Sequence, residues 1–278
     1  MPPSQSLHGA GDVTPELAAL LARRETDCRL TPDRALDTLD DAEAFVAERG
    51  MLTLTPDCAL PSLFGACHEE PYRAGGHGFA SWPKTRYWWG FALSQRADIH
   101  VARLHRGKSL YLSTPTVAAF DPLCRAALAR ADEGAVGATA AELVAYLEVA
   151  GPTPIEDVKR ELGLDAASLR ATRDKLERVG AIVSRGMTLP VSQGGERETS
   201  ELARWDQRFP SPLASSASSA ADALGEAVVA GIRAAVVAPR AEVAAWFSWP
   251  LPRDLLASLL VADRLWQPQE GWLAAREE

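Results

Sequence analysis

The sequence predicts a mainly α-helical chain with small β-hairpins. Segments with helical apolar periodicity recur along all 278 residues, and proline, glycine and capping residues separate them at short intervals. Twice, three short helices are followed by a hairpin, which is the order of elements in a winged helix. In that arrangement the second and third helices form a helix-turn-helix. We therefore predict tandem winged-helix (helix-turn-helix) units.

The first predicted unit, residues 13–130, follows a short polar tail (residues 1–12) that we expect to be disordered. Thr14-Pro15 begins a first helix to residue 24. Asp40, with Glu43 three residues later, predicts a capping box for a helix over 40–48. A strand over 51–55 and a helix over 60–67 come next. Strands over 99–104 and 109–113 flank a turn at Arg106-Gly107, and a helix over 115–129 closes the unit.

The middle unit, residues 131–193, has the clearest pattern. Capping boxes at 139–142 and 153–156 open two helices, and Asp165 caps a third over 166–179 that ends at Gly180. Strands over 181–184 and 188–191 then predict a hairpin with Arg185-Gly186-Met187 as its turn. Residues 194–214 read as a linker. The last unit, 215–278, repeats the order with helices over 219–236, 240–247 and 253–261 and a hairpin over 265–273.

Composition limits the classes of protein that the chain can belong to. An apolar fraction of 47% and a charged fraction of 24% are typical of a globular protein. No window holds the eighteen or so apolar residues that a membrane span needs, and the first residues resemble neither a secretory signal nor a transit peptide. Four scattered cysteines without a CxxC pattern favour a reduced chain. We therefore expect a cytoplasmic protein with no membrane association.

The net charge of −8 is unevenly distributed. Residues 84–130 carry eight basic and two acidic side chains, whereas residues 1–83 carry six basic and thirteen acidic ones. Two interpretations are equally open at this stage. The basic segment could hold a polyanion such as DNA, or it could pair with the acidic segment inside the fold.

Four stretches of sequence resemble a known family. They are AEAFVAERGMLTLTPDCALPSLFGA (42–66), WGFALSQRADIHVARLHRGKSLYLS (89–113), GPTPIEDVKRELGL (151–164) and EVAAWFSWPLPRDLLASLLVADRL (242–265). Over roughly residues 34–266 the chain resembles the AlkZ/YcaQ-like family, tandem winged-helix proteins that include bacterial DNA glycosylases for alkylation and crosslink repair. It looks most like the shorter AlkZ-related branch. The resemblance implies a DNA-binding protein linked to DNA repair or damage tolerance, with double-stranded DNA as its partner.

The family's active glycosylases carry a Gln-x-Asp or Gln-x-Gln triplet in the first unit. Thr53-Leu54-Thr55 stands at the equivalent place, and Asp57 is the nearest carboxylate. Base hydrolysis needs a group that orients or deprotonates water, and threonine is a poor base. Two interpretations follow. The chain is a non-catalytic DNA-binding relative, or it releases alkylated purines with Asp57 orienting water, assisted by Thr53 or Thr55.

Two elements are candidates for DNA contact. In the third helix of the middle unit, Arg170 and Arg178 share a face with Asp174, and Lys175 flanks it. They either contact DNA or pair with that aspartate. The stronger candidate is the basic hairpin, where arginine favours backbone or minor-groove contacts. Adjacent tryptophans before it either stack on a base or anchor the core. The residues concerned are Arg96, Arg103, Arg106, Lys108, Trp88 and Trp89.

Other chemistries lack support in the sequence. The loop with His68-Glu69-Glu70 and His77 matches no metal-ligand spacing, so we predict no metal site. No glycine-rich phosphate loop, HExxH or GxSxG occurs, and we predict no cofactor and no bound nucleotide. A third hypothesis is a protein-interaction module, because winged helices also bind protein partners. Salt dependence would separate it from DNA binding.

Overall fold

The computed structural model describes residues 13–190, 195–213 and 219–276, so the predicted tail over 1–12 lies outside it. Its first part holds these elements: α1 (Pro15–Asp27), a 3-10 turn (Pro32–Arg34), α2 (Leu39–Arg49), β1 (Met51–Thr53), α3 (Leu63–Ala66), a second 3-10 turn (Gly78–Ser81), α4 (Trp89–Leu93), β2 (Ile99–His105), β3 (Lys108–Ser113) and α5 (Thr114–Asp132).

The remainder of the chain adds two further groups of elements. The middle group is α6 (Ala138–Ala150), β4 (Thr153–Pro154), α7 (Ile155–Glu161), α8 (Ala166–Arg178), β5 (Ile182–Pro190), β6 (Glu196–Arg204) and α9 (Trp205–Arg208). The last group is α10 (Ala220–Ala235), β7 (Val237–Pro239), α11 (Arg240–Val243), α12 (Leu255–Val261), β8 (Leu265–Trp266) and β9 (Trp272–Ala275). The expected mainly helical class with small hairpins is confirmed.

The described strands form three small sheets with one shared pattern. In each, an early single strand pairs antiparallel with the second strand of a later hairpin, which gives the orders β1-β3-β2, β4-β6-β5 and β7-β9-β8. The pairs Met51–Leu112, Thr153–Leu202 and Val237–Ala274 fix the three registers. The single strands β4 and β7 are too short for periodicity to reveal, so the sequence predicted only the hairpins.

Several predicted boundaries need correction. Thr38, not Asp40, caps α2, and it forms the capping box with Asp41. Gly137 and Pro154 precede α6 and α7, and neither helix has a side-chain cap, so the two predicted capping boxes are wrong. Asp165 caps α8 as predicted. Its Oδ1 accepts hydrogen bonds of 2.8 Å from the backbone N–H groups of Ala167 and Ser168.

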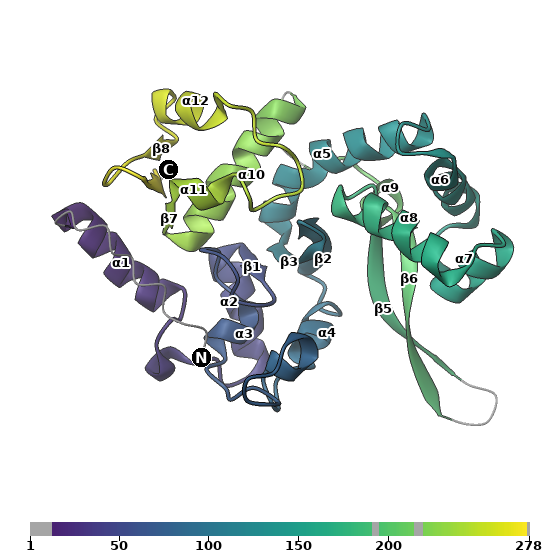
Figure 1. Ribbon diagram of the computed structural model, residues 1–278, viewed down its shortest axis with the longest axis horizontal. Coiled ribbons are helices and arrows are strands. Elements are labelled where there is room, and N and C mark those ends of the chain that lie inside the picture. The colour runs from purple at the N-terminus through teal and green to yellow at the C-terminus, as the bar shows by residue number, and fades with distance from the viewer. Residues whose placement is uncertain (1–12, 191–194, 214–218, 277–278) are drawn as a thin grey trace.

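The middle hairpin differs most from its prediction. β5 runs unbroken through Gly186, which pairs with Ser200 of β6, and the register continues to Pro190–Glu196. Gly186 is needed for close approach, because a Cβ there would lie 2.4 Å from Cε2 of Phe91 on α4. The segment predicted as a linker, 194–214, contains β6 and α9. The hairpin therefore extends away from the helices, as Figure 1 shows.

Helices α5 and α10 lie together at the centre of the molecule (Figure 1). The main apolar core is continuous across all three sheets. It includes Leu104 and Leu110 near the first sheet, Ile182 and Leu202 in the second, and Leu273 in the third. Phe120 of α5 meets Phe247 edge to face, with ring centroids 5.2 Å apart. This core therefore joins residues of all three groups of elements, and two smaller clusters of buried apolar residues accompany it.

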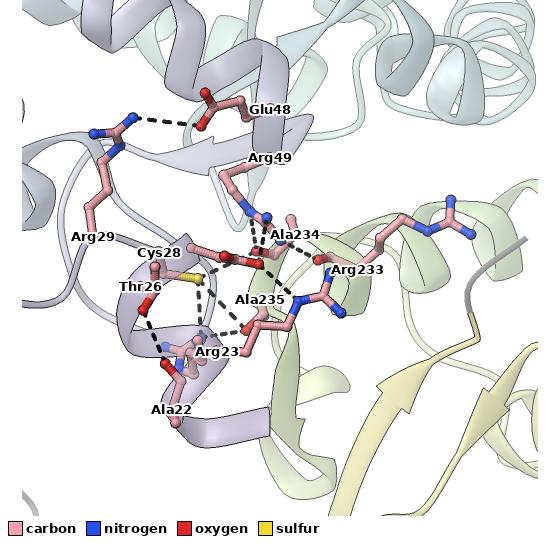
Figure 2. A network of polar contacts seen from close by, with 12 residues as sticks. Ala22, Arg23, Thr26, Cys28, Arg29, Glu48, Arg49, Arg233, Ala234 and Ala235 are labelled. Carbon is pink, nitrogen blue, oxygen red and sulfur yellow. Dashed lines mark hydrogen bonds and ion pairs between the residues drawn. The ribbon is translucent and has the colours of Figure 1, made fainter. Parts of the chain in front are cut away.

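Arginines of the first part bind the C-terminal end of α10 (Figure 2). Arg49 donates to the carbonyls of Ala234 (3.1 Å) and Arg233 (2.7 Å), and Arg24 donates to the carbonyl of Ala235 (2.8 Å). The last carbonyls of a helix lack intrahelical partners and carry partial negative charge. The two guanidinium groups therefore satisfy these carbonyls and attach α1 and α2 to α10.

None of the helices in the described ranges has the length and apolar character that a membrane crossing requires.

A buried carboxylate on α5 joins the first part to the middle part. Asp121 is 2% exposed, and its oxygens accept hydrogen bonds from Trp205 Nε1 (2.7 Å), Arg125 Nε (2.9 Å) and the Leu213 N–H (3.2 Å). Each of the two oxygens therefore accepts at least one hydrogen bond.

We expect Asp121→Ala to lower the free energy of unfolding by about 3 kcal/mol, because it leaves a buried indole N–H and a half-buried guanidinium without their acceptor. Urea unfolding measures the change. Glu161→Ala is the control, since it removes an exposed carboxylate whose ion pair in the described part of the chain is with Arg160, and it should leave the midpoint unchanged. Equal midpoints for the two variants would contradict this role of Asp121.

Candidate nucleic-acid interface

The basic hairpin, β2 and β3, is largely neutralised by acidic side chains of the same chain. Arg96 contacts Asp40 (2.8 Å) and Glu43 (3.1 Å) on α2. Lys108 pairs with Asp57 in the loop after β1. Of the two interpretations of the charge pattern, these contacts match internal pairing of the basic and acidic segments.

Arg103 is paired in the same way, but with the middle part. Its Nη1 donates to Asp174 and Glu177 on α8, both at 3.0 Å. Glu177 is 2% exposed and also contacts Arg173 (3.4 Å) and the hydroxyl of Ser184. Arg103 is thus a structural link between β2 and α8.

The ion pair between Arg103 and Asp174 affects the charge on the exposed face of α8. Asp174 pairs with Arg103, and among the described residues it forms no ion pair with Arg170 or Arg178, so the internal pairing considered for this helix is absent there. Arg170, Lys175 and Arg178 are all exposed. Within the described residues none of these three side chains has an ion pair or a hydrogen bond.

Arg106 extends the exposed basic surface to the hairpin turn. It has φ 52°, so it reverses the chain together with Gly107, and its side chain is exposed. A Cβ built on Gly107 would lie 3.3 Å from Nη2 of Arg178, so the turn and the end of α8 are neighbours. We call Arg106, Arg170, Lys175 and Arg178 the basic strip.

An aromatic cleft of about 450 Å³ lies between the first part and the β5–β6 hairpin. Trp88 is 47% exposed and lines it, whereas Trp89 is buried beneath the guanidinium of Arg86, 5.1 Å from the ring centroid. Of the two tryptophans predicted to stack on a base, only Trp88 is therefore accessible. The other cleft residues include Phe79, Tyr87, Phe91, Arg103, Tyr111, Glu177, Glu198 and Ser200.

The structure does not assemble the predicted catalytic residues around this cleft. Thr53 is 2% exposed, and its hydroxyl donates to the carbonyl of Thr55 at 3.0 Å. Asp57 is held by Lys108 and lies 3.4 Å from Nε2 of His105. Neither threonine nor Asp57 is among the residues that line the cleft. Leu54, the middle residue of the triplet position, does line it.

The described thiols offer no ready nucleophile. Burial raises the pKa of Cys58 to about 11 and the pKa of Cys67 to about 12, so both are protonated near neutral pH.

Sequence reasoning missed two cleft residues, Tyr111 and Glu177. Burial raises the pKa of Tyr111, so its phenol stays neutral. In the sequence, Glu177 is one of several charged residues on a predicted helix. Its i,i+4 spacing from Arg173 indicated one ion-pair partner, but no local pattern indicated the ion pair with Arg103. Phe91 belonged to the aromatic run that was recognised, but its packing against Gly186 depends on the tertiary fold.

Comparison with known proteins identifies the architecture. No protein-family model and no curated protein matches the sequence. Among solved structures, the Streptomyces sahachiroi DNA glycosylase AlkZ is similar, with a TM-score of 0.52 and 12% identity. The alignment covers 92% of this chain and 68% of that one. At this identity the similarity concerns the fold, and it confirms the family resemblance at that level: the chain has an AlkZ-like fold.

Proposed function

We propose that this protein binds double-stranded DNA through the basic strip, with α8 as the recognition helix of a helix-turn-helix formed by α7 and α8. The three groups of helices and strands would then be winged-helix units in tandem. The observation that carries the proposal is the exposed face of α8, where Arg170, Lys175 and Arg178 have no ion-pair or hydrogen-bond partner among the residues that the structure describes.

Internal pairing decides which cations are available to phosphates. Arg96 would have to give up two carboxylates to bind a phosphate, and Arg103 would have to leave the buried Glu177 unneutralised. The basic strip carries no such cost. A local field of this kind attracts DNA even though the whole chain has a net charge of −8.

The aromatic cleft suggests how damaged or distorted DNA would be recognised. Arg103 lines the cleft and also contacts Asp174 on α8, so the cleft adjoins the helix of the basic strip. Trp88 and Phe91 are 47% and 42% exposed, and exposed rings in a cleft can stack on a base that has left the duplex. The similarity to a DNA glycosylase supports a role in DNA repair or damage tolerance.

Base hydrolysis is not part of the proposal. The triplet position offers Thr53, whose buried hydroxyl donates to a carbonyl, and Thr55, which is not basic at neutral pH. The nearest carboxylate, Asp57, forms an ion pair with Lys108. We therefore favour a DNA-binding relative that does not activate water.

The first test is the salt dependence of binding to a short duplex, followed by fluorescence anisotropy. Four phosphate contacts predict a slope of about −3.6 in log K against log salt, and roughly a hundredfold loss of affinity between 50 and 200 mM. The combined variant Arg170→Ala, Lys175→Ala and Arg178→Ala should remove about 2.7 of that slope, since each lost phosphate contact removes about 0.9.

Arg96→Ala is the matched control, because it removes the same charge from a paired position and should leave the slope unchanged. If Arg96→Ala lowers the salt slope more than Arg170→Ala does, the hairpin and not α8 contacts the DNA. A DNA affinity that does not change with salt concentration, or no DNA binding at all, would favour a protein-interaction module.

The second test measures base release from a duplex that contains N7-methylguanine. We expect release equal to a control without protein, because no described group at the triplet position can deprotonate water. Release above the control that is lost in Asp57→Asn, with binding retained, would instead establish a glycosylase with Asp57 at its centre.

A further inference from the structure

We propose that Asp57, Cys58 and His105 form a zinc-type metal site where the first and last parts of the chain meet. The carboxylate, the thiol and the imidazole each offer one ligand atom, and these three atoms lie within 4.8 Å of one another. The site is separate from the basic strip and from the aromatic cleft, and it does not depend on DNA binding.

The orientation of His105 is the strongest evidence. This side chain is fully buried, and its Nδ1 lies 2.5 Å from the carbonyl oxygen of Trp246. A carbonyl only accepts hydrogen bonds, so Nδ1 carries a proton, and Nε2 is the ring nitrogen left to bind a metal ion. Metal-binding histidines are commonly oriented by such a carbonyl on the other ring nitrogen.

The environment of Nε2 calls for a cation. This buried nitrogen has no hydrogen-bond partner, and Oδ1 of Asp57 lies 3.4 Å from it. A metal ion bound by both atoms would give the buried nitrogen the partner that it lacks.

The donor set is one that zinc prefers. Imidazole nitrogen, thiolate and carboxylate oxygen bind Zn²⁺ at about 2.0–2.3 Å, so ligand atoms in a tetrahedral site are about 3.3–3.8 Å apart. The three ligand atoms already lie within 4.8 Å of one another, and neither Asp57 nor Cys58 is fully buried. The thiol of Cys58 would release its proton to solvent when it binds the metal, and one thiolate and one carboxylate then neutralise the dication. Lys108 contacts the other carboxylate oxygen, Oδ2, and leaves Oδ1 for the metal.

Hydrogen bonds with the last part of the chain hold both segments of the site. The N–H of Ala59 donates to Glu242 Oε2 at 2.8 Å, and the N–H of Ser248 donates to the Leu104 carbonyl at 3.1 Å. A bound ion would strengthen this junction, because a ligand that binds only the folded chain stabilises it. The sequence predicted no metal site, since its ligands come from segments far apart in the chain.

The test uses untagged full-length protein that has been treated with EDTA and desalted. Zn²⁺ is titrated in competition with a chromophoric chelator, and Co²⁺ is followed by its thiolate charge-transfer absorption. We expect one ion per chain and a rise in Tm of about 5 °C or more at a hundredfold excess over Kd. Cys58→Ser and Asp57→Asn should each weaken binding at least tenfold, and Cys58→Ser should abolish the charge-transfer band.

Two further variants distinguish a metal site from a simple ion pair. Cys67→Ser, which removes a buried thiol elsewhere in the first part, should leave binding and the cobalt spectrum unchanged. Lys108→Met should tighten Zn²⁺ binding severalfold, because it removes a competing cation from Asp57. The proposal is overturned if the wild type binds no ion more tightly than Cys58→Ser does. It is also overturned if Lys108→Met only lowers Tm without changing metal affinity, because the cluster is then an ion pair.

Discussion

The burial of helix α5 against the first sheet, α9 and α10 is the constraint on which the rest of the structure depends. Neighbouring side chains of this helix bind different parts of the chain. Phe120 packs on Phe247, and Asp121 accepts the indole N–H of Trp205. Cys124 lies where a Cβ on Gly180 would come within 2.3 Å of its sulfur, so the end of α8 fits there only as glycine. A rotation of α5 would break all three contacts at once.

This shared core explains why charge pairing crosses between parts that look separate in sequence. Once α5 fixes β2 beside α8, Arg103 reaches Asp174 and Glu177, and the acids of α8 are neutralised from outside their own helix. Arg170, Lys175 and Arg178 of α8 are then left facing solvent. The tertiary arrangement therefore pairs Arg96, Arg103 and Lys108 of the basic segment with acidic side chains, whereas these three cations of α8 stay exposed.

At the end of β2, a buried side chain, His105, is followed directly by an exposed one, Arg106. His105 points inward to the carbonyl of Trp246 and to Asp57, while Arg106, with a positive φ, is exposed, and Gly107 after it lies beside Arg178 at the end of α8. One short turn thereby contributes to both proposed sites, the cluster of metal-ligating groups and the exposed strip of cations.

The sequence by itself determined the local features: most helices, the β2–β3 turn at Arg106-Gly107, the Asp165 cap and the family resemblance that the AlkZ-like fold confirms. These depend on periodicity and capping, which neighbouring residues carry. Tertiary structure alone decided that Gly186 lies within a strand, that Trp88 is exposed while Trp89 is buried, and that Asp57 meets His105. Those outcomes depend on contacts between distant segments, whose geometry follows from how the core packs and not from any local pattern.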